Sequence, residues 1–186
     1  IGLNPKETPQ SVYVKDIRTY SKIRKNLEEN YGFSEWKLVQ TMTFDSNADA
    51  SLHTDDIFLD ASVRGCLVGM LISLEQMTSL SGGINLYDYS KIEIDDMYAP
   101  VTSSVDLENF KSNDDVYSAR GYYLEVLNKK IDKSRKSPTL LSQGEVVSWS
   151  SYIPHESLRG SKDFIHSRRS IAAVSYTHLT LPTSTH

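Results

Sequence analysis

The chain has 186 residues, of which 39% are hydrophobic and 24% charged, and its formal net charge is −4. These values exclude a disordered chain and allow one domain with a sizeable core. The acidic balance gives no reason to expect a nucleic-acid partner. The longest apolar run, about Cys66 to Leu74, is too short to span a membrane. Cys66 is the only cysteine, which rules out an internal disulfide and favours a reducing, cytoplasmic location.

Both ends of the sequence are unusual. The chain opens on Ile1 rather than on a methionine, so we expect that an upstream part is missing. Residues 174–186 resemble translated sequencing-adapter read-through. We therefore predict a single domain over residues 1–173 and an artefactual tail over 174–186, whose histidines receive no functional role.

Hydrophobic periodicity divides the first half of the chain into four elements. Apolar residues at helical spacing predict a helix over 19–31, which Gly32 would end. Alternation predicts a strand over 36–44. A nearly continuous apolar run predicts a buried strand over 67–74, and a short strand over 84–87 follows a glycine turn.

The second half begins with an acidic, irregular segment, 88–117, which we interpret as an excursion from the core such as a lid or substrate loop. A helix is predicted over 117–133 and a strand over 145–149. A loop that carries His155 then leads to a last strand, 168–173. Strands placed early and late around a helical insertion predict a mainly β fold with flanking helices, namely a double-stranded β-helix (a cupin-like jelly roll).

One short motif, His53-Thr54-Asp55, suggests a metal site. In an extended segment residues i and i+2 face the same side, so His53 and Asp55 would offer an imidazole and a carboxylate to one point. These are two of the three ligands of the 2-His-1-carboxylate triad that binds Fe(II). The pair alone also fits a chance His–Asp contact. His155 is the candidate third ligand, and His166 is the alternative.

The surroundings of these residues follow a recognisable order. Early in the chain the order is His53-Thr54-Asp55, a strand at 69–72, Ser73-Leu74-Glu75 and Ser81-Gly82-Gly83. Late in the chain it is Gly144-Glu145, Trp149, His155 with Ser157, and Arg168 to Ala173. Over residues 36–173 this resembles the phytanoyl-CoA dioxygenase family of Fe(II)- and 2-oxoglutarate-dependent oxygenases.

The resemblance implies an Fe(II) site whose ligands are His53, Asp55 and His155. It implies 2-oxoglutarate and O2 as co-substrates in the oxidation, usually hydroxylation, of a small organic or acyl substrate. The presence of Asp55 argues against the halogenase variant, which lacks this carboxylate. A second hypothesis is a non-catalytic jelly-roll binding module, or a degenerate relative that keeps only the shape.

The resemblance also implies an anchor for the distal carboxylate of 2-oxoglutarate. Arg168 would pair with this carboxylate and Ser157 would hydrogen-bond it. Arginine suits a fixed, bidentate contact with a carboxylate better than lysine does. Arg169 is the competing anchor, and the spacing to Ser170 favours Arg168.

The chain departs from the family pattern at two positions near the expected site. Leu71 stands where many relatives have a tryptophan beside the cofactor, and Glu156 replaces a glycine after the distal histidine. We expect Glu156 to be a charge that could face the substrate.

Other residues have simpler interpretations. Trp149 is expected in the core, and Gln40 and Met42 are expected to face the core, with the cofactor pocket as the less favoured alternative. Asp56 is expected to be no ligand but either a surface carboxylate or one that orients His53 by a hydrogen bond.

Overall fold

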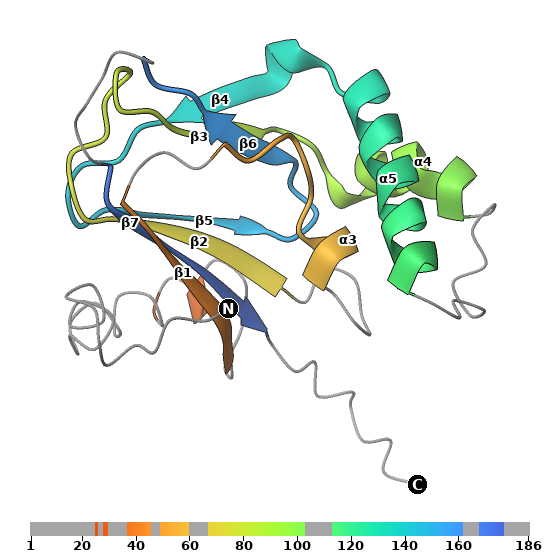
Figure 1. Ribbon diagram of the computed structural model, residues 1–186, viewed down its shortest axis with the longest axis horizontal. Coiled ribbons are helices and arrows are strands. Elements are labelled where there is room, and N and C mark those ends of the chain that lie inside the picture. Colours follow the sequence, from red (N-terminus) through yellow and green to blue (C-terminus); the bar gives the residue numbers. More distant parts are fainter. Residues whose placement is uncertain are drawn as a thin grey trace, which may run out of the picture.

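Two antiparallel sheets face each other, and helices α4 and α5 pack at one end of them (Figure 1). This is the double-stranded β-helix predicted from the sequence. The computed structural model describes residues 25, 28, 29, 37–45, 49–59, 67–102, 113–161 and 168–176. The helix predicted over 19–31 falls almost entirely outside these residues.

The larger sheet has four strands in the order β1-β7-β2-β5. Their bounds are Lys37–Phe44 (β1), Ser170–Tyr176 (β7), Leu67–Ser73 (β2) and Val146–Ser150 (β5). The four predicted strands in these regions are confirmed. Strand β7 continues through Tyr176, opposite both Lys37 of β1 and Leu67 of β2. The sheet therefore includes residues 174–176, which we had predicted to belong to the tail.

The smaller sheet has three strands in the order β4-β3-β6. Their bounds are Lys136–Thr139 (β4), Gly83–Tyr87 (β3) and His155–Leu158 (β6). Only β3 was predicted, and the loop predicted around His155 is wrong, because His155 pairs with Leu86 of β3. Both missed strands have four residues and are mainly polar, so they form only because β3 supplies hydrogen-bonding partners on each of its edges.

Two helices occupy most of the segment predicted to be irregular. Helix α4 spans Lys91–Thr102, and α5 spans Asn113–Lys130, four residues earlier than its predicted start. The short helices α3 (Asp56–Leu59) and η2 (Lys133–Arg135) complete the set of named helices. Among the described residues, no helix is both long and apolar enough to cross a membrane.

Two hydrophobic clusters hold the layers together. The cluster between the sheets contains Leu71, Met77, Ile84, Leu141 and Trp149. The other joins the smaller sheet to the helices and includes Tyr87, Ile94, Tyr98, Tyr123 and Leu127. Ile94 and Tyr98 of α4 and Leu127 of α5 have no solvent exposure. The described parts of the acidic segment are therefore packed into the fold and are not the excursion from the core that we had expected.

The start of α4 is fixed by a capping box. The backbone N–H of Ser90 donates to Glu93 Oε2 at 2.8 Å, and that of Glu93 donates to Ser90 Oγ at 3.3 Å. Arg135 Nη1 donates to Glu93 Oε1 at 2.7 Å, and its guanidinium lies 3.8 Å from the centre of the Tyr89 ring. The hydrogen bond from Arg135, followed by those from Ser90, lowers the pKa of Glu93 to about 2.

Replacing Glu93 by glutamine tests this arrangement through pH. The folded-state pKa of Glu93 lies below its unfolded value, so the charged form stabilises the fold above about pH 4.5 and stops doing so as pH falls through about 2. We expect Glu93→Gln to be less stable than the wild type at pH 6 and equally stable near pH 2. Urea unfolding across this range measures the difference. A difference that is constant with pH would contradict the prediction.

Candidate metal centre

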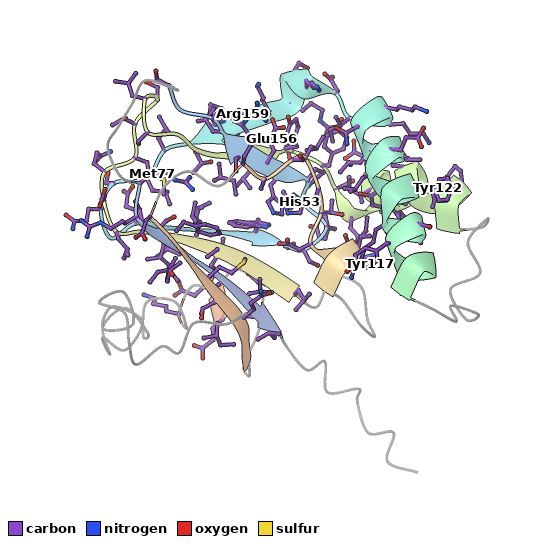
Figure 2. All side chains as sticks on the ribbon, viewed as in Figure 1. His53, Met77, Tyr117, Tyr122, Glu156 and Arg159 are labelled. Carbon is purple, nitrogen blue, oxygen red and sulfur yellow. The ribbon has the colours of Figure 1, made fainter. Side chains whose placement is uncertain are left out.

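The site begins with a backbone pairing between two histidines far apart in the sequence. The N–H of His53 donates to the carbonyl oxygen of His155 at 3.0 Å, and the N–H of His155 donates to that of His53 at 2.8 Å. Because of this pairing, the two histidine side chains leave the backbone at neighbouring positions. The two imidazole rings lie 4.3 Å apart between their centres, at 53° to each other. Figure 2 shows His53 between the two sheets.

Both imidazoles are held in the tautomer that leaves Nε2 free to bind a metal. His53 Nδ1 lies 2.6 Å from the carbonyl oxygen of Ser51, and His155 Nδ1 lies 2.9 Å from that of Ile153. A carbonyl oxygen only accepts, so each Nδ1 carries the hydrogen and each Nε2 keeps its lone pair. The contact from Ser51 fills the role at His53 that we had expected for Asp56.

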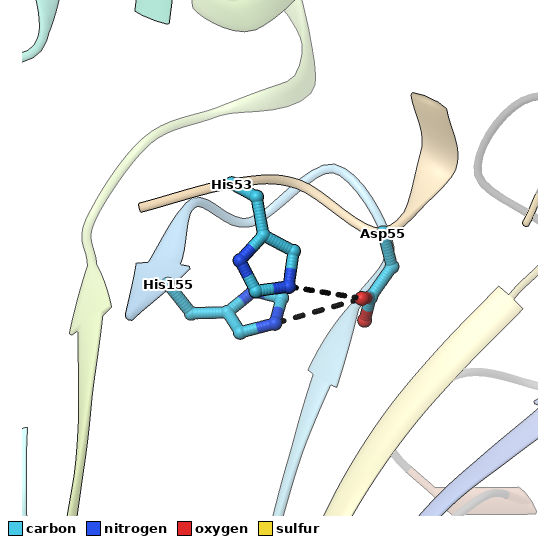
Figure 3. Close-up of side chains that lie close together, drawn as sticks. All are labelled: His53, Asp55 and His155. Carbon is cyan, nitrogen blue, oxygen red and sulfur yellow. Dashed lines mark ion pairs between the residues drawn. The ribbon is translucent and has the colours of Figure 1, made fainter. Parts of the chain in front are cut away.

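The lone pairs of both histidines face one carboxylate oxygen. Asp55 Oδ1 lies 3.7 Å from His53 Nε2 and 3.5 Å from His155 Nε2 (Figure 3). The other oxygen, Oδ2, accepts a hydrogen bond of 3.1 Å from Trp149 Nε1. His155 is buried, and this burial lowers the pKa of its imidazole. The neutral imidazole that results is the form that binds metals.

This geometry fits a single metal ion. One donor atom from each of His53, Asp55 and His155 lies within 4.8 Å of the others, and among the described residues no other such group of three is found. Two ligands about 2.1 Å from one ion and at right angles to each other lie roughly 3.0 Å apart. The separations of 3.5 and 3.7 Å exceed that value by about 0.5 and 0.7 Å, distances that small side-chain rotations can close.

The middle residue of the motif connects the site to the helices. Thr54 is fully buried, and its Oγ1 lies 3.1 Å from the hydroxyl of Tyr98 on α4. The Tyr98 ring meets Tyr123 of α5 edge-on, with centres 5.0 Å apart. Asp56, which begins α3, donates its backbone N–H to the carbonyl oxygen of Ser151. The segment between the two ligands is thereby fixed on both sides.

A cavity of about 130 Å³ opens beside the three donors. Its lining is mostly apolar, and the polar side chains on it include those predicted to bind the co-substrate, Arg168 and Ser157. The apolar lining includes Met42, Phe44, Leu71, Ile84, Ala172 and Val174. All five predicted site residues therefore border one space.

Arg168 is a buried cation without an anionic partner among the described residues. It is 4% exposed, its Nη1 donates to the carbonyl oxygen of Gly83 at 3.0 Å, and its Nε is buried without a hydrogen-bond acceptor. Burial lowers the pKa of this guanidinium. Arg169 differs, because its side chain is exposed and pairs with Glu75. Of the two arginines, only Arg168 lines the cavity.

Ser157 faces the same side of β6 as His155, two residues earlier. Its Oγ accepts the backbone N–H of Ala50 at 3.0 Å. The hydroxyl hydrogen is thus left to donate, which is what a bound carboxylate would need. Ser170, two residues after Arg168, is also buried, and its hydroxyl has no partner among the described residues.

Other sequence predictions for this region have mixed outcomes. Leu71 and Met42 line the cavity, so Met42 follows the less favoured alternative. Neither Met42 nor Gln40 is buried in the core, because both are exposed. Glu156 lines the cavity, as expected of a charge that could face the substrate, and its Oε1 accepts hydrogen bonds from Tyr87 and Asn85 on β3. His166, the alternative ligand, lies outside the described residues.

The sequence analysis missed the contact between Trp149 and Asp55. The sequence feature that could have revealed this contact is the position of Trp149 on a strand, where alternation directs Val147 and Trp149 to the same side. An inward tryptophan close to a predicted ligand needs a partner for its N–H, because a buried indole N–H is normally hydrogen-bonded.

No protein-family profile matches the sequence, and no curated protein is significantly similar to it. Solved structures share the fold. The non-heme alpha-ketoglutarate-dependent epimerase SnoN from nogalamycin biosynthesis is 13% identical, with a TM-score of 0.56 over 88% of this chain and 57% of that chain. EvdO2 from Micromonospora carbonacea var. aurantiaca, solved with 2-oxoglutarate, is 14% identical, with a TM-score of 0.57 over 91% and 64%.

The non-heme alpha-ketoglutarate-dependent carbocyclase SnoK, also from nogalamycin biosynthesis, is 9% identical, with a TM-score of 0.58 over 93% of this chain and 60% of that chain. At such low identities the likeness establishes the fold alone. The chain spans less than two thirds of the length of these three structures. Membership of the phytanoyl-CoA dioxygenase family stays a prediction.

Replacing His155 by alanine tests whether His155 or His166 is the third ligand. We expect His155→Ala to weaken binding of Co(II) by roughly 100-fold or more, because it removes a ligand. His166→Ala should bind Co(II) as the wild type does. Titration calorimetry with Co(II) alone measures both affinities. Loss of binding in His166→Ala with retention in His155→Ala would overturn the assignment.

Proposed function

We propose that the protein is a non-haem Fe(II)- and 2-oxoglutarate-dependent oxygenase, which oxidises a small organic or acyl substrate and most simply hydroxylates it. One observation carries the proposal. Two imidazole nitrogens and one carboxylate oxygen converge beside a cavity that also holds a buried guanidinium. Two histidines and one carboxylate, with positions left open, are the ligand set of Fe(II) oxygenases that activate O2.

The structures with the same fold support this choice through what they contain. A solved SnoN complex holds Fe3+, alpha-ketoglutarate and nogalamycin RO. Another neighbour is described as a non-heme monooxygenase, ThoJ, in complex with Ni. The reactions named for these proteins differ, so the fold does not select hydroxylation over another oxidation. The Asp55 carboxylate argues against the halogenase variant alone, and hydroxylation is proposed as the simplest of the remaining oxidations.

The three ligand residues would each act through one atom. His53 and His155 would bind Fe(II) through Nε2, since their Nδ1 atoms are engaged with backbone carbonyls. Asp55 would bind through Oδ1, the oxygen that faces both Nε2 atoms. The bound iron, with 2-oxoglutarate and O2, supplies the oxidising chemistry that no side chain can provide.

Arg168 and Ser157 would hold the distal carboxylate of 2-oxoglutarate. A buried guanidinium without a counter-ion is costly, and a bound carboxylate removes that cost. The free Nε of Arg168 offers a donor, and the Ser157 hydroxyl can add a second. A charge-assisted bond of this kind is stronger than one between neutral groups.

The apolar walls of the cavity would keep water away from the reacting groups. Side chains from both sheets form these walls, including Met42, Leu71 and Ile84. Excluding water strengthens the contact between Arg168 and its carboxylate and prevents side reactions. Leu71 provides apolar surface at the position where many members of the resembled family have tryptophan.

The competing hypothesis, a binding module without catalysis, predicts that the ligand residues need not converge. Here the side chains of His53, Asp55 and His155 point to one place, and the tautomers suit metal binding. A module that binds only an organic ligand has no need for this arrangement. Convergence therefore favours the oxygenase.

Anaerobic titration with Fe(II) and 2-oxoglutarate tests the proposal. We expect a visible charge-transfer band when both are present, since 2-oxoglutarate chelates the metal through its keto acid end. Asp55→Ala should abolish the band. Folded protein that gives no band would contradict the proposal. Succinate release across a panel of small substrates then identifies the substrate class.

The two neighbouring arginines provide a matched pair of variants. Arg168→Ala should weaken 2-oxoglutarate binding by about 30-fold or more, because truncating one partner of a buried charge pair costs about 2 kcal/mol or more. Arg169→Ala should leave binding unchanged, because Arg169 is exposed and pairs with Glu75. The intensity of the same band against 2-oxoglutarate concentration gives both affinities. The opposite result would assign the anchor to Arg169.

A further inference from the structure

Trp149 has a position that depends on a glycine in the neighbouring strand. It lies on β5 opposite Gly69 of β2 and is 7% exposed. A Cβ atom added to Gly69 would lie 2.5 Å from Cε2 and 2.6 Å from Nε1 of the indole. The missing side chain of Gly69 therefore gives the indole the space in which it lies.

In this position the indole contacts two of the three proposed ligands. Its Nε1–H donates to Asp55 Oδ2 at 3.1 Å, and its ring lies 4.9 Å from the His155 ring between centres. Asp55 Oδ1, in contrast, faces the two histidine Nε2 atoms. The two oxygens of one carboxylate thus have different partners, and an indole N–H can only donate.

We infer that Trp149 is a positioning residue, which makes Asp55 a ligand through one oxygen only. The indole hydrogen bond occupies Oδ2 and fixes the rotation of the carboxylate, so that Oδ1 alone faces the metal position. A carboxylate that bound through both oxygens would take one more coordination position. The inference rests on the proposed function, because it concerns how many positions stay open for the co-substrates.

A purely structural role for Trp149 is the alternative. A buried tryptophan needs an acceptor for its N–H, and Asp55 could simply satisfy that need. Trp149 is also part of the cluster between the sheets, so its volume contributes to stability. The two roles differ in what the N–H does, because packing depends on the volume of the ring and positioning depends on its donor.

The test separates volume from donor and uses Co(II) as the probe. Trp149→Phe keeps an aromatic ring and removes the N–H, and Leu141→Ala truncates another member of the same cluster, one that does not line the cavity. Loss of a hydrogen bond that orients a ligand typically weakens metal binding by about 10- to 100-fold. We expect this loss in Trp149→Phe and unchanged affinity in Leu141→Ala, even if both are less stable.

The visible absorption of bound Co(II) is the second measurement. It should shift in Trp149→Phe, because the freed Oδ2 can enter the coordination shell, and it should not shift in Leu141→Ala. Wild-type affinity and spectrum in Trp149→Phe would overturn the inference and leave the proposed function intact. Failure of the wild type to bind Co(II) would instead refute the metal site itself.

An isosteric replacement covers the case in which Trp149→Phe does not fold. The chain has two tryptophans, so a Trp36→Phe protein can carry 3-benzothienylalanine, which has sulfur in place of the indole N–H, at position 149 alone. The same Trp36→Phe protein with ordinary tryptophan is the reference. Weaker Co(II) binding in the analogue supports positioning, and equal binding refutes it.

Discussion

The two backbone hydrogen bonds between His53 and His155 are the constraint on which the site depends. They join a segment that follows β1 to a strand near the end of the chain, and they bring two imidazoles within 4.3 Å between ring centres. Local geometry then supplies the rest. Asp55 and Ser157 lie two residues after the paired histidines, and Ser157 therefore faces the same side of β6 as His155. One pairing thus assembles groups from both ends of the sequence.

Closure of the two sheets makes that pairing possible. Strand β7 lies between β1 and β2. Arg168, which precedes β7, therefore borders the same cavity as residues of β1 and β2. The chain passes from β5 in one sheet to β6 in the other within a few residues. Trp149 and His155 therefore come from different sheets, and their rings lie 4.9 Å apart between centres. The bond between Thr54 and Tyr98 ties this arrangement to α4.

The elements that could be predicted from the sequence are those whose buried side chains produce a recognisable run or spacing of apolar residues. The apolar run of β2 is visible because every residue of this strand is buried, and the spacing of histidine and aspartate indicated the ligands. Strands β4 and β6 were missed because pairing with β3, and not their own composition, makes them extended. Helix α4 was missed because its acidic residues and Pro100 conceal the buried Ile94 and Tyr98.

Two polar groups in the interior do little for the fold itself. A buried guanidinium with one backbone acceptor, as at Arg168, and a buried carboxylate facing two imidazoles, as at Asp55, both cost desolvation that apolar residues of similar volume would avoid. A cation and an anion bound at these places would remove both costs at once. Because such ligands bind only the folded state, they stabilise it by mass action. The polar interior is therefore best explained by what the cavity binds.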